Sequence, residues 1–206
     1  VIRNLYLCSY FFPMAERLRD NRKTEEIRAQ LRETELEVRN FIYPLFVEEG
    51  ENIKKEIPSM PGIFRYSLER INEEIDEVVA LGIESVILFG IPLKKDAEGS
   101  ESWNDEGIIQ KAIRQIKADY PNLQVIADVC FCEYTDHGHC GVLCNHDVDN
   151  DKTLLNLRKQ VLAQAKAGID MVAPSGMMDF AVREIRDELD KNGYEHIPIM
   201  GYSVKY

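Results

Sequence analysis

Residues 124–143, which read QVIADVCFCEYTDHGHCGVL, constrain the fold of this chain more than any other stretch. They begin as an apolar run rich in β-branched residues, typical of a buried strand, and end in a polar loop. Side chains alternate across a strand, so Asp128, Cys130 and Cys132 are predicted to share one face, and the residues between them the other. The chain must therefore fold so that a buried strand carries chemically active side chains into a loop.

Cys130, Cys132 and Cys140 form a candidate metal site within this stretch. Thiolates suit zinc, and zinc held by three protein ligands keeps a fourth position open for water or substrate. The C-x-C-x7-C spacing does not match the paired C-x-x-C spacing of zinc ribbons. Two alternatives stay open from the spacing alone. One is a closed structural site with Cys144 or a histidine as fourth ligand, and the other is a group of reduced thiols without metal.

Composition narrows the class of protein. The chain has 206 residues, 45% hydrophobic and 30% charged, which suits one globular domain or part of one. A formal net charge of -11 disfavours nucleic acid and anionic membranes as partners, and no apolar run approaches the ~20 residues that span a bilayer. Four of the five cysteines lie between Cys130 and Cys144, which favours reduced thiols in the cytoplasm over a secreted disulfide framework.

Strand and helix patterns alternate along the chain. Strands are predicted in the cysteine stretch and at 41–47, 85–90, 171–175 and 197–203. Helices are predicted to begin at the N-caps Thr24 and Ser67, and three further helices are predicted at 104–117, 153–167 and 182–191. The near-continuous apolar strands indicate a parallel sheet buried on both faces. A doubly wound sheet and a (β/α)8 barrel both fit, although no G-x-G-x-x-G follows the first strand, which disfavours dinucleotide binding.

Seven segments carry a resemblance to a known family. They are NFIYPLFVEEG, IPSMPGIFRYS, ILFGIP, GSESWNDEGIIQKAIRQIK, ADVCFCEYTDHGHCGVL, AGIDMVAPSGMMD and IPIMGYSVKY. In this order, from about Arg17 to Tyr206, the sequence resembles the zinc-dependent branch of the porphobilinogen synthase family, also called delta-aminolevulinic acid dehydratase. The resemblance implies a (β/α)8 TIM barrel of which about the first five βα units are present.

The resemblance also implies domains and a function. Residues 1–39 would be a leader and an N-terminal helical arm, which in the family embraces a neighbouring subunit, and residues 40–206 a partial TIM-barrel domain. No function is assigned to residues 1–13. The implied activity is that of a lyase of heme and tetrapyrrole biosynthesis, which condenses two 5-aminolevulinate molecules to porphobilinogen with loss of two waters. The implied assembly is a homo-oligomer, an octamer in the family.

The family's site residues are carried over where the motifs match. Cys130, Cys132 and Cys140 would hold zinc, and a magnesium requirement stays open. Lys205, in GYSVKY, would take part in Schiff-base chemistry; without the resemblance it reads as a surface lysine at a frayed end. Asp128 could orient a ligand or shuttle a proton, and Ser175 either contacts substrate or caps a helix.

Some features depart from the family. The second lysine, in a V-K-P-G motif, has no counterpart in this sequence, and five βα units cannot close an eight-stranded barrel. We therefore expect no turnover from the 206-residue chain, and the alternative is a non-catalytic, zinc-binding truncated relative. An unrelated Schiff-base aldolase on a barrel is the other rival. Gly176, Phe180 and Ala181 replace an acid, a glycine and often a basic residue, and Phe180 is expected to crowd a tight loop.

Overall fold

The computed structural model describes residues 18–202 of the chain, which divides into two compact units, Val1–Leu36 and Glu37–Tyr206. The described part of the first unit contains η1 (Leu18–Arg22) and α1 (Glu25–Gln30). The second unit contains η2 (Val38–Asn40), β1 (Ile42–Glu48), β2 (Lys54–Ile57), β3 (Met60–Tyr66), α2 (Ile71–Ala80), β4 (Ser85–Ile91), η3 (Ser100–Trp103), α3 (Ile108–Asp119), β5 (Gln124–Val129), β6 (Leu143–Cys144), β7 (Asp147–Val148), α4 (Asn150–Ala167), β8 (Met171–Pro174) and α5 (Ala181–Lys191).

Helix α1 begins where the sequence predicts. The Thr24 hydroxyl accepts a hydrogen bond from the backbone N–H of Ile27 at 3.3 Å, and Glu25 and Glu26 lie in the first turn, where the helix dipole favours negative charge. The helix is shorter than the predicted apolar stripe, because Val38 lies in the separate helix η2 of the second unit. Only the start of this element was therefore predicted correctly.

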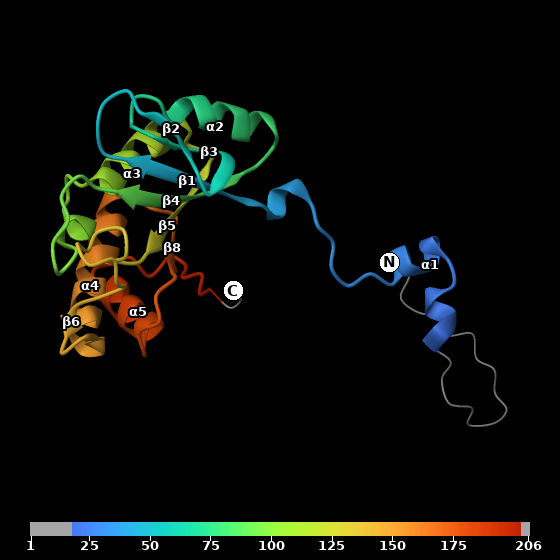
Figure 1. Ribbon diagram of the computed structural model, residues 1–206. Coiled ribbons are helices and arrows are strands. Elements are labelled where there is room, and N and C mark those ends of the chain that lie inside the picture. The colour runs from blue at the N-terminus through green and yellow to red at the C-terminus, as the bar shows by residue number, and fades with distance from the viewer. Residues whose placement is uncertain (1–17, 203–206) are drawn as a thin grey trace. The chain divides into compact units, whose positions relative to one another are not determined.

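Six strands of the second unit form one sheet in the order β2-β3-β1-β4-β5-β8. β1, β4, β5 and β8 are parallel to their neighbours, so that Leu45 pairs with Leu88 and Leu88 with Ala127. Parallel neighbours need a crossover connection, and α2, α3 and α4 supply it. Figure 1 shows α2, α3, α4 and α5 around the outer side of this row of strands.

The parallel strands bury side chains on both faces, as predicted. On the helix side, alternate residues such as Val86, Val125 and Val172 join the main core. On the opposite side, Ile87, Ile126 and Ala173 form a smaller cluster, with Phe89, Met171 and Met200 packed against it. Side chains from several parallel strands thus converge on the face away from the helices, as they do inside a barrel.

Glycines end three of the helices, in agreement with the sequence patterns. Gly82, Gly168 and Gly193 have positive φ values, a conformation that costs glycine little. The start of α2 was predicted wrongly. Ser67 does not cap this helix; its hydroxyl accepts the backbone N–H of Ile53 at 2.9 Å, and α2 begins at Ile71 after an intervening turn. The hydroxyl therefore joins the β2 segment to the end of β3.

Two hairpins were not predicted. β2 pairs antiparallel with β3, and the short strands β6 and β7 pair around Asn145 and His146, which both have positive φ. The sequence of β2, Lys-Lys-Glu-Ile, is charged and exposed and carries no apolar alternation. β2 therefore lacks the hydrophobic pattern by which strands are recognised, and β6 and β7, of two residues each, are too short to show one.

The last predicted strand, 197–203, does not form a regular strand in its described part; there, Ile199 makes a single parallel bridge with Val172. The backbone N–H of Met200 also donates to the Val172 carbonyl at 2.9 Å, so this segment continues the sheet beyond β8. Lys205 lies outside the described residues. Among helices within residues 18–202, none combines the length and apolar character that crossing a membrane requires.

Candidate metal centre

The cysteine loop begins where strand β5 ends. β5 stops at Val129, so Cys130 directly follows the strand, and a tight turn comes next, in which the N–H groups of Tyr134 and Thr135 both donate to the Phe131 carbonyl at 2.9 Å. The prediction that Cys132 continues the strand is wrong. Its side chain reaches that of Cys130 because the chain turns, and not because of strand alternation.

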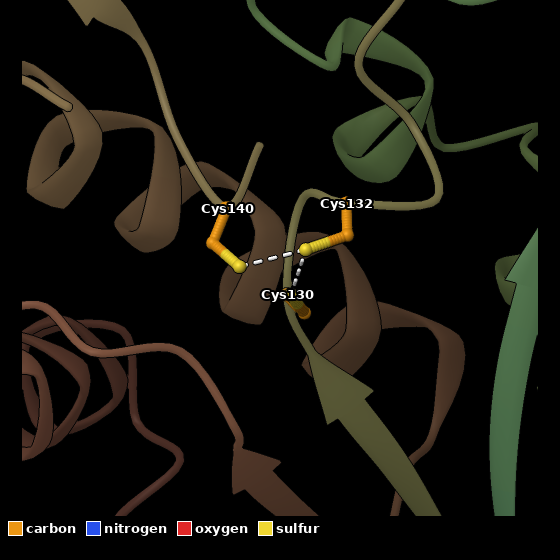
Figure 2. A group of neighbouring side chains, drawn as sticks. All are labelled: Cys130, Cys132 and Cys140. Atoms are coloured by element: carbon orange, nitrogen blue, oxygen red, sulfur yellow. Dashed lines mark hydrogen bonds between the residues drawn. The ribbon is translucent and has the colours of Figure 1, made fainter. Parts of the chain in front are cut away.

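Three thiols converge at this carboxyl end of the sheet. The Sγ atoms of Cys130 and Cys132 are 3.4 Å apart, and those of Cys132 and Cys140 are 2.7 Å apart. All three Sγ atoms lie within 4.8 Å of one another, and the cysteines are free rather than disulfide-bonded. Figure 2 shows Cys140 and Cys132 pointing toward each other from two segments of chain, with Cys130 beside them at the end of β5. The arrangement can hold a metal ion.

The donor set fits a soft or borderline ion. Zinc bonds to thiolate sulfur at about 2.3 Å, which places tetrahedral ligands about 3.8 Å apart, so small rotations of the three side chains would accommodate it. Without a cation the site favours neutral thiols. Burial raises the pKa of Cys130 strongly and, together with the Cys140 thiol, raises the pKa of Cys132 to about 11. Three thiolates in one place therefore need a positive partner.

Oxygen donors lie next to the thiols. Asp128, Cys130 and Glu133 form a second group whose ligand atoms are within 4.8 Å of one another. Asp128 is buried on β5, and its Oδ1 accepts a hydrogen bond from the Tyr202 hydroxyl at 3.3 Å. Burial and this neighbouring carboxylate raise the pKa of Tyr202, so its hydroxyl stays protonated and donates. The Asp128 carboxylate is thus held by a donor from the segment that follows β8.

The other candidate ligands are placed apart from the thiols. His137 Nδ1 accepts the backbone N–H of His139 at 3.1 Å, so in the neutral ring Nε2 carries the proton and donates to the Ala97 carbonyl at 3.2 Å. Within the described part of the chain, the three-thiol group includes neither histidine, and it does not include the exposed Cys144. The position beside the three sulfurs therefore receives no fourth protein ligand from these residues.

Ser175 lies near the cysteine loop. Its backbone N–H donates to the Val129 carbonyl at 3.4 Å, which places the residue after β8 beside the residue before Cys130. Gly176 and Ala181 line a small cavity together with Cys130 and Cys140. A Cβ atom added at Gly176 would meet no atom within 4 Å, so this position has room for a residue other than glycine.

Helix α4 supplies residues that the sequence reasoning missed. Gln160 and Gln164 donate to the carbonyls of Cys130 and Asp128, at 3.0 and 3.2 Å. The available signal was a pair of glutamines four residues apart, and so on one side of a helix that is rich in Leu and Ala. Glutamines on a buried face need partners, and strand ends supply carbonyls.

Comparisons with known proteins agree with the resemblance. A family model described as delta-aminolevulinic acid dehydratase matches residues 15–206. The delta-aminolevulinic acid dehydratase of Halalkalibacterium halodurans is 50% identical over 191 residues, which are 93% of this chain and 58% of that protein. The protein of the same name from Ruminiclostridium josui is 49% identical over 193 residues, which are 94% of each chain.

A solved structure supports the fold. The crystal structure of delta-aminolevulinic acid dehydratase (porphobilinogen synthase) from Toxoplasma gondii, in complex with the reaction product porphobilinogen, matches with a TM-score of 0.84 at 38% identity. The match covers 95% of this chain and 56% of that one, so the chain spans somewhat more than half the length of this structure and of the first relative. The predicted fold class, part of a TIM barrel, is confirmed, and the doubly wound alternative is excluded.

Proposed function

Because the chain belongs to the delta-aminolevulinic acid dehydratase family, we propose that it takes part in the porphobilinogen synthase reaction, the condensation of two 5-aminolevulinate molecules with loss of two waters. The observation that carries this proposal is the convergence of three thiols at the carboxyl end of β5. Chemistry in βα barrels takes place at this end of the strands, and Asp128 and Ser175 lie on or next to the same strand ends.

Zinc is the proposed metal, held by Cys130, Cys132 and Cys140. A bound zinc ion would act as a Lewis acid toward a substrate oxygen. The set of three sulfur ligands favours zinc over magnesium, which prefers oxygen ligands. Magnesium at a further position remains a separate proposal and would need oxygen donors of its own.

The chain's own residues have distinct proposed roles. The buried Asp128 carboxylate accepts the Tyr202 hydroxyl and can hold or move a proton beside the thiols. Ser175, after the neighbouring strand, is the proposed substrate contact. Lys205, which lies outside the described residues, is the proposed amine that forms an imine with 5-aminolevulinate.

The remaining proposals concern the chain as a whole. Residues 1–39 are proposed as an arm that contacts another subunit of a homo-oligomer, and residues 40–206 as the barrel domain. The described cysteines are free, which supports a reducing compartment, and we propose the cytoplasm. The net charge of -11 supports a small-molecule substrate rather than nucleic acid.

Metal binding tests the centre directly. We expect the purified chain to bind one zinc ion, and Cys132→Ala to lower the affinity at least a hundredfold, because a ligand is lost. Cys144→Ala is the matched control: this thiol is exposed and stands apart from the three-thiol group, so the affinity should not change. Measurement is by competition with a chromophoric chelator. Equal affinities of the two variants would refute the assignment of Cys132.

Borohydride trapping tests the chemistry. We expect reduction in the presence of 5-aminolevulinate to add to wild type the mass of one substrate less one water, lost when the imine forms, plus two hydrogens from the reduction, and to add nothing to Lys205→Ala. Trapping without any effect of a chelator would favour the aldolase rival, and zinc uptake without trapping would favour the non-catalytic relative. The sequence contains no V-K-P-G motif, so the 206-residue polypeptide by itself should release no porphobilinogen. Detection of porphobilinogen would contradict that expectation.

A further inference from the structure

Helix α4 presents a buried polar face to the cysteine loop. Thr153, Gln160 and Gln164 are spaced seven and four residues apart, so they lie along one side of the helix. None of the three side chains is more than 1% exposed. The helix is otherwise rich in Leu and Ala, so polar residues on its buried side require partners in the segments that they contact.

Gln160 contacts the first segment that carries thiols. Its Nε2 donates to the Cys130 carbonyl at 3.0 Å. Pairing of β5 with β4 ends at Ala127, so the Cys130 carbonyl lies past the part of β5 that this neighbouring strand holds. The Gln160 Oε1 atom is buried and has no hydrogen-bond partner among the described residues. A leucine or methionine would fill the same space without burying an unsatisfied oxygen. The amide is therefore explained by the Cys130 carbonyl and not by packing.

Thr153 contacts the second segment that carries thiols. Its Oγ1 accepts the backbone N–H of Val142 at 3.0 Å and donates to the Asp149 carbonyl at 2.7 Å. A Cβ atom at Gly141 would overlap the Thr153 hydroxyl, so only glycine permits the chain to approach the helix this closely. Gly141 directly follows Cys140, so this contact fixes the backbone next to the Cys140 thiol.

We infer that Thr153 and Gln160 are positioning residues, which together set the separation between the Cys140 and Cys130 thiols and so the fit of the metal ion. The two residues are seven positions apart on one rigid helix, about 10.5 Å along its axis. The helix thereby links two loop segments whose thiols must meet at one point. Partners of this kind orient the ligands of metal sites in general. The inference rests on the proposed function only in that these thiols bind metal.

The test uses two variants and two matched controls. Thr153→Val and Gln160→Met keep the side-chain volume and remove the hydrogen bonds. Ser67→Ala removes another buried hydroxyl that accepts a backbone N–H, and Gln110→Met removes another buried amide that donates to a carbonyl, that of Ser102. Both controls lie outside the cysteine loop, so they report what the loss of a buried hydrogen bond does to stability alone.

Two quantities are measured on the full chain: zinc affinity by chelator competition, and the absorption spectrum of the cobalt(II)-loaded protein, whose thiolate charge-transfer and d–d bands report ligand geometry. We expect Thr153→Val and Gln160→Met each to weaken zinc binding about tenfold and to shift the cobalt bands. The two controls should keep the zinc affinity and the cobalt spectrum of wild type, even if their melting temperatures fall as much as those of Thr153→Val and Gln160→Met.

The outcomes separate the two levels of the proposal. If wild type binds neither metal through these thiols, the metal centre and the positioning role both fail. If wild type binds metal but Thr153→Val and Gln160→Met match their controls in affinity and spectrum, only the positioning role fails. A change confined to one of the two variants would refute the joint role of the helix.

Discussion

Phe180 occupies a backbone conformation that suits glycine. Its φ of 66° and ψ of 12° lie in the left-handed region, which side chains with a Cβ rarely adopt. The ring does not crowd the loop as expected, because it is 63% exposed and stacks over the Arg183 guanidinium at 4.5 Å. The cost of this residue lies in its Cβ, which the left-handed conformation disfavours.

Replacement of Phe180 can separate this backbone cost from loss of the ring. Phe180→Gly and Phe180→Ala both remove the contact with Arg183, and only alanine keeps a Cβ. We expect Phe180→Gly to be more stable than Phe180→Ala by about 1 kcal/mol in urea unfolding. Equal stabilities of the two variants would show that the left-handed conformation carries no cost here.

For single residues, the sequence predicted which side chains form the metal site better than it predicted how the backbone places them. The spacing of Cys130, Cys132 and Cys140 indicated a common site, and the three thiols do meet. The predicted backbone conformation was wrong for Cys132, because β5 ends at Val129 and the alternation of side chains along the strand ends with it. Gln160 and Thr153 escaped notice because their partners are backbone atoms, which a sequence pattern does not reveal.

Helix α2 is joined to two strands through one carboxylate. The hydroxyls of Tyr43 on β1 and Tyr66 on β3 both donate to Glu74, the first at 2.5 Å. Burial, followed by the hydrogen bond to Glu74, raises the pKa of Tyr43 to about 12 from its ordinary 10. The same two causes raise the pKa of Tyr66. Protonated tyrosines are thus part of the packing between this helix and the sheet.

The contact predicts a loss of stability in alkali. The unfolded chain releases the Tyr43 proton near pH 10 and the folded chain near pH 12, so the stability that the hydroxyl contributes is complete below pH 10 and is lost between pH 10 and 12. We expect Tyr43→Phe to cost about 1–2 kcal/mol at pH 8. In urea unfolding, the difference in free energy of unfolding between Tyr43→Phe and wild type should be smaller at pH 11 than at pH 8. An equal difference at the two pH values would contradict this account.

Elements with a strong hydrophobic period were predicted and those without one were missed. The alternation of β1, β4, β5 and β8 with α2 to α5 follows from runs that bury both strand faces and one helix face. The strands β2, β3, β6 and β7 were missed. β2, β6 and β7 are short and mostly exposed, and, apart from Met60, the hydrophobic residues of β3 lie only in its second half, after Pro61 and Gly62.

The two compact units divide the chain at Leu36 and Glu37. The second unit contains the whole sheet and both clusters of buried hydrophobic side chains. The described residues of the first unit are exposed or half-buried, with no residue in the core. The folding energy of the second unit therefore comes from its own contacts.

Deletion of the first unit tests this division. A chain of residues 37–206 should have a free energy of unfolding within about 0.5 kcal/mol of that of the full chain, because no described residue of the first unit belongs to the core. If residues 1–39 form an intersubunit arm as proposed, the same deletion should lower the mass of the assembly in solution. A large loss of stability in 37–206 would refute the division.

At the scale of the molecule, local patterns indicated parallel βα units but not how the sheet curves. Closure into a barrel depends on strand tilt and stagger, which no single residue specifies. The choice between barrel and open sheet came from the family resemblance, and the superposition on the Toxoplasma gondii enzyme agrees with it.

The hairpin strand β2 has a consequence for how these molecules behave at high concentration. It is the outermost strand on its side of the sheet formed by the described residues, and its charged residues Lys54, Lys55 and Glu56 are exposed. A strand from another molecule would have to strip water from these charges before it could pair there. Lateral stacking of copies into fibrils is thereby discouraged on this flank of the sheet.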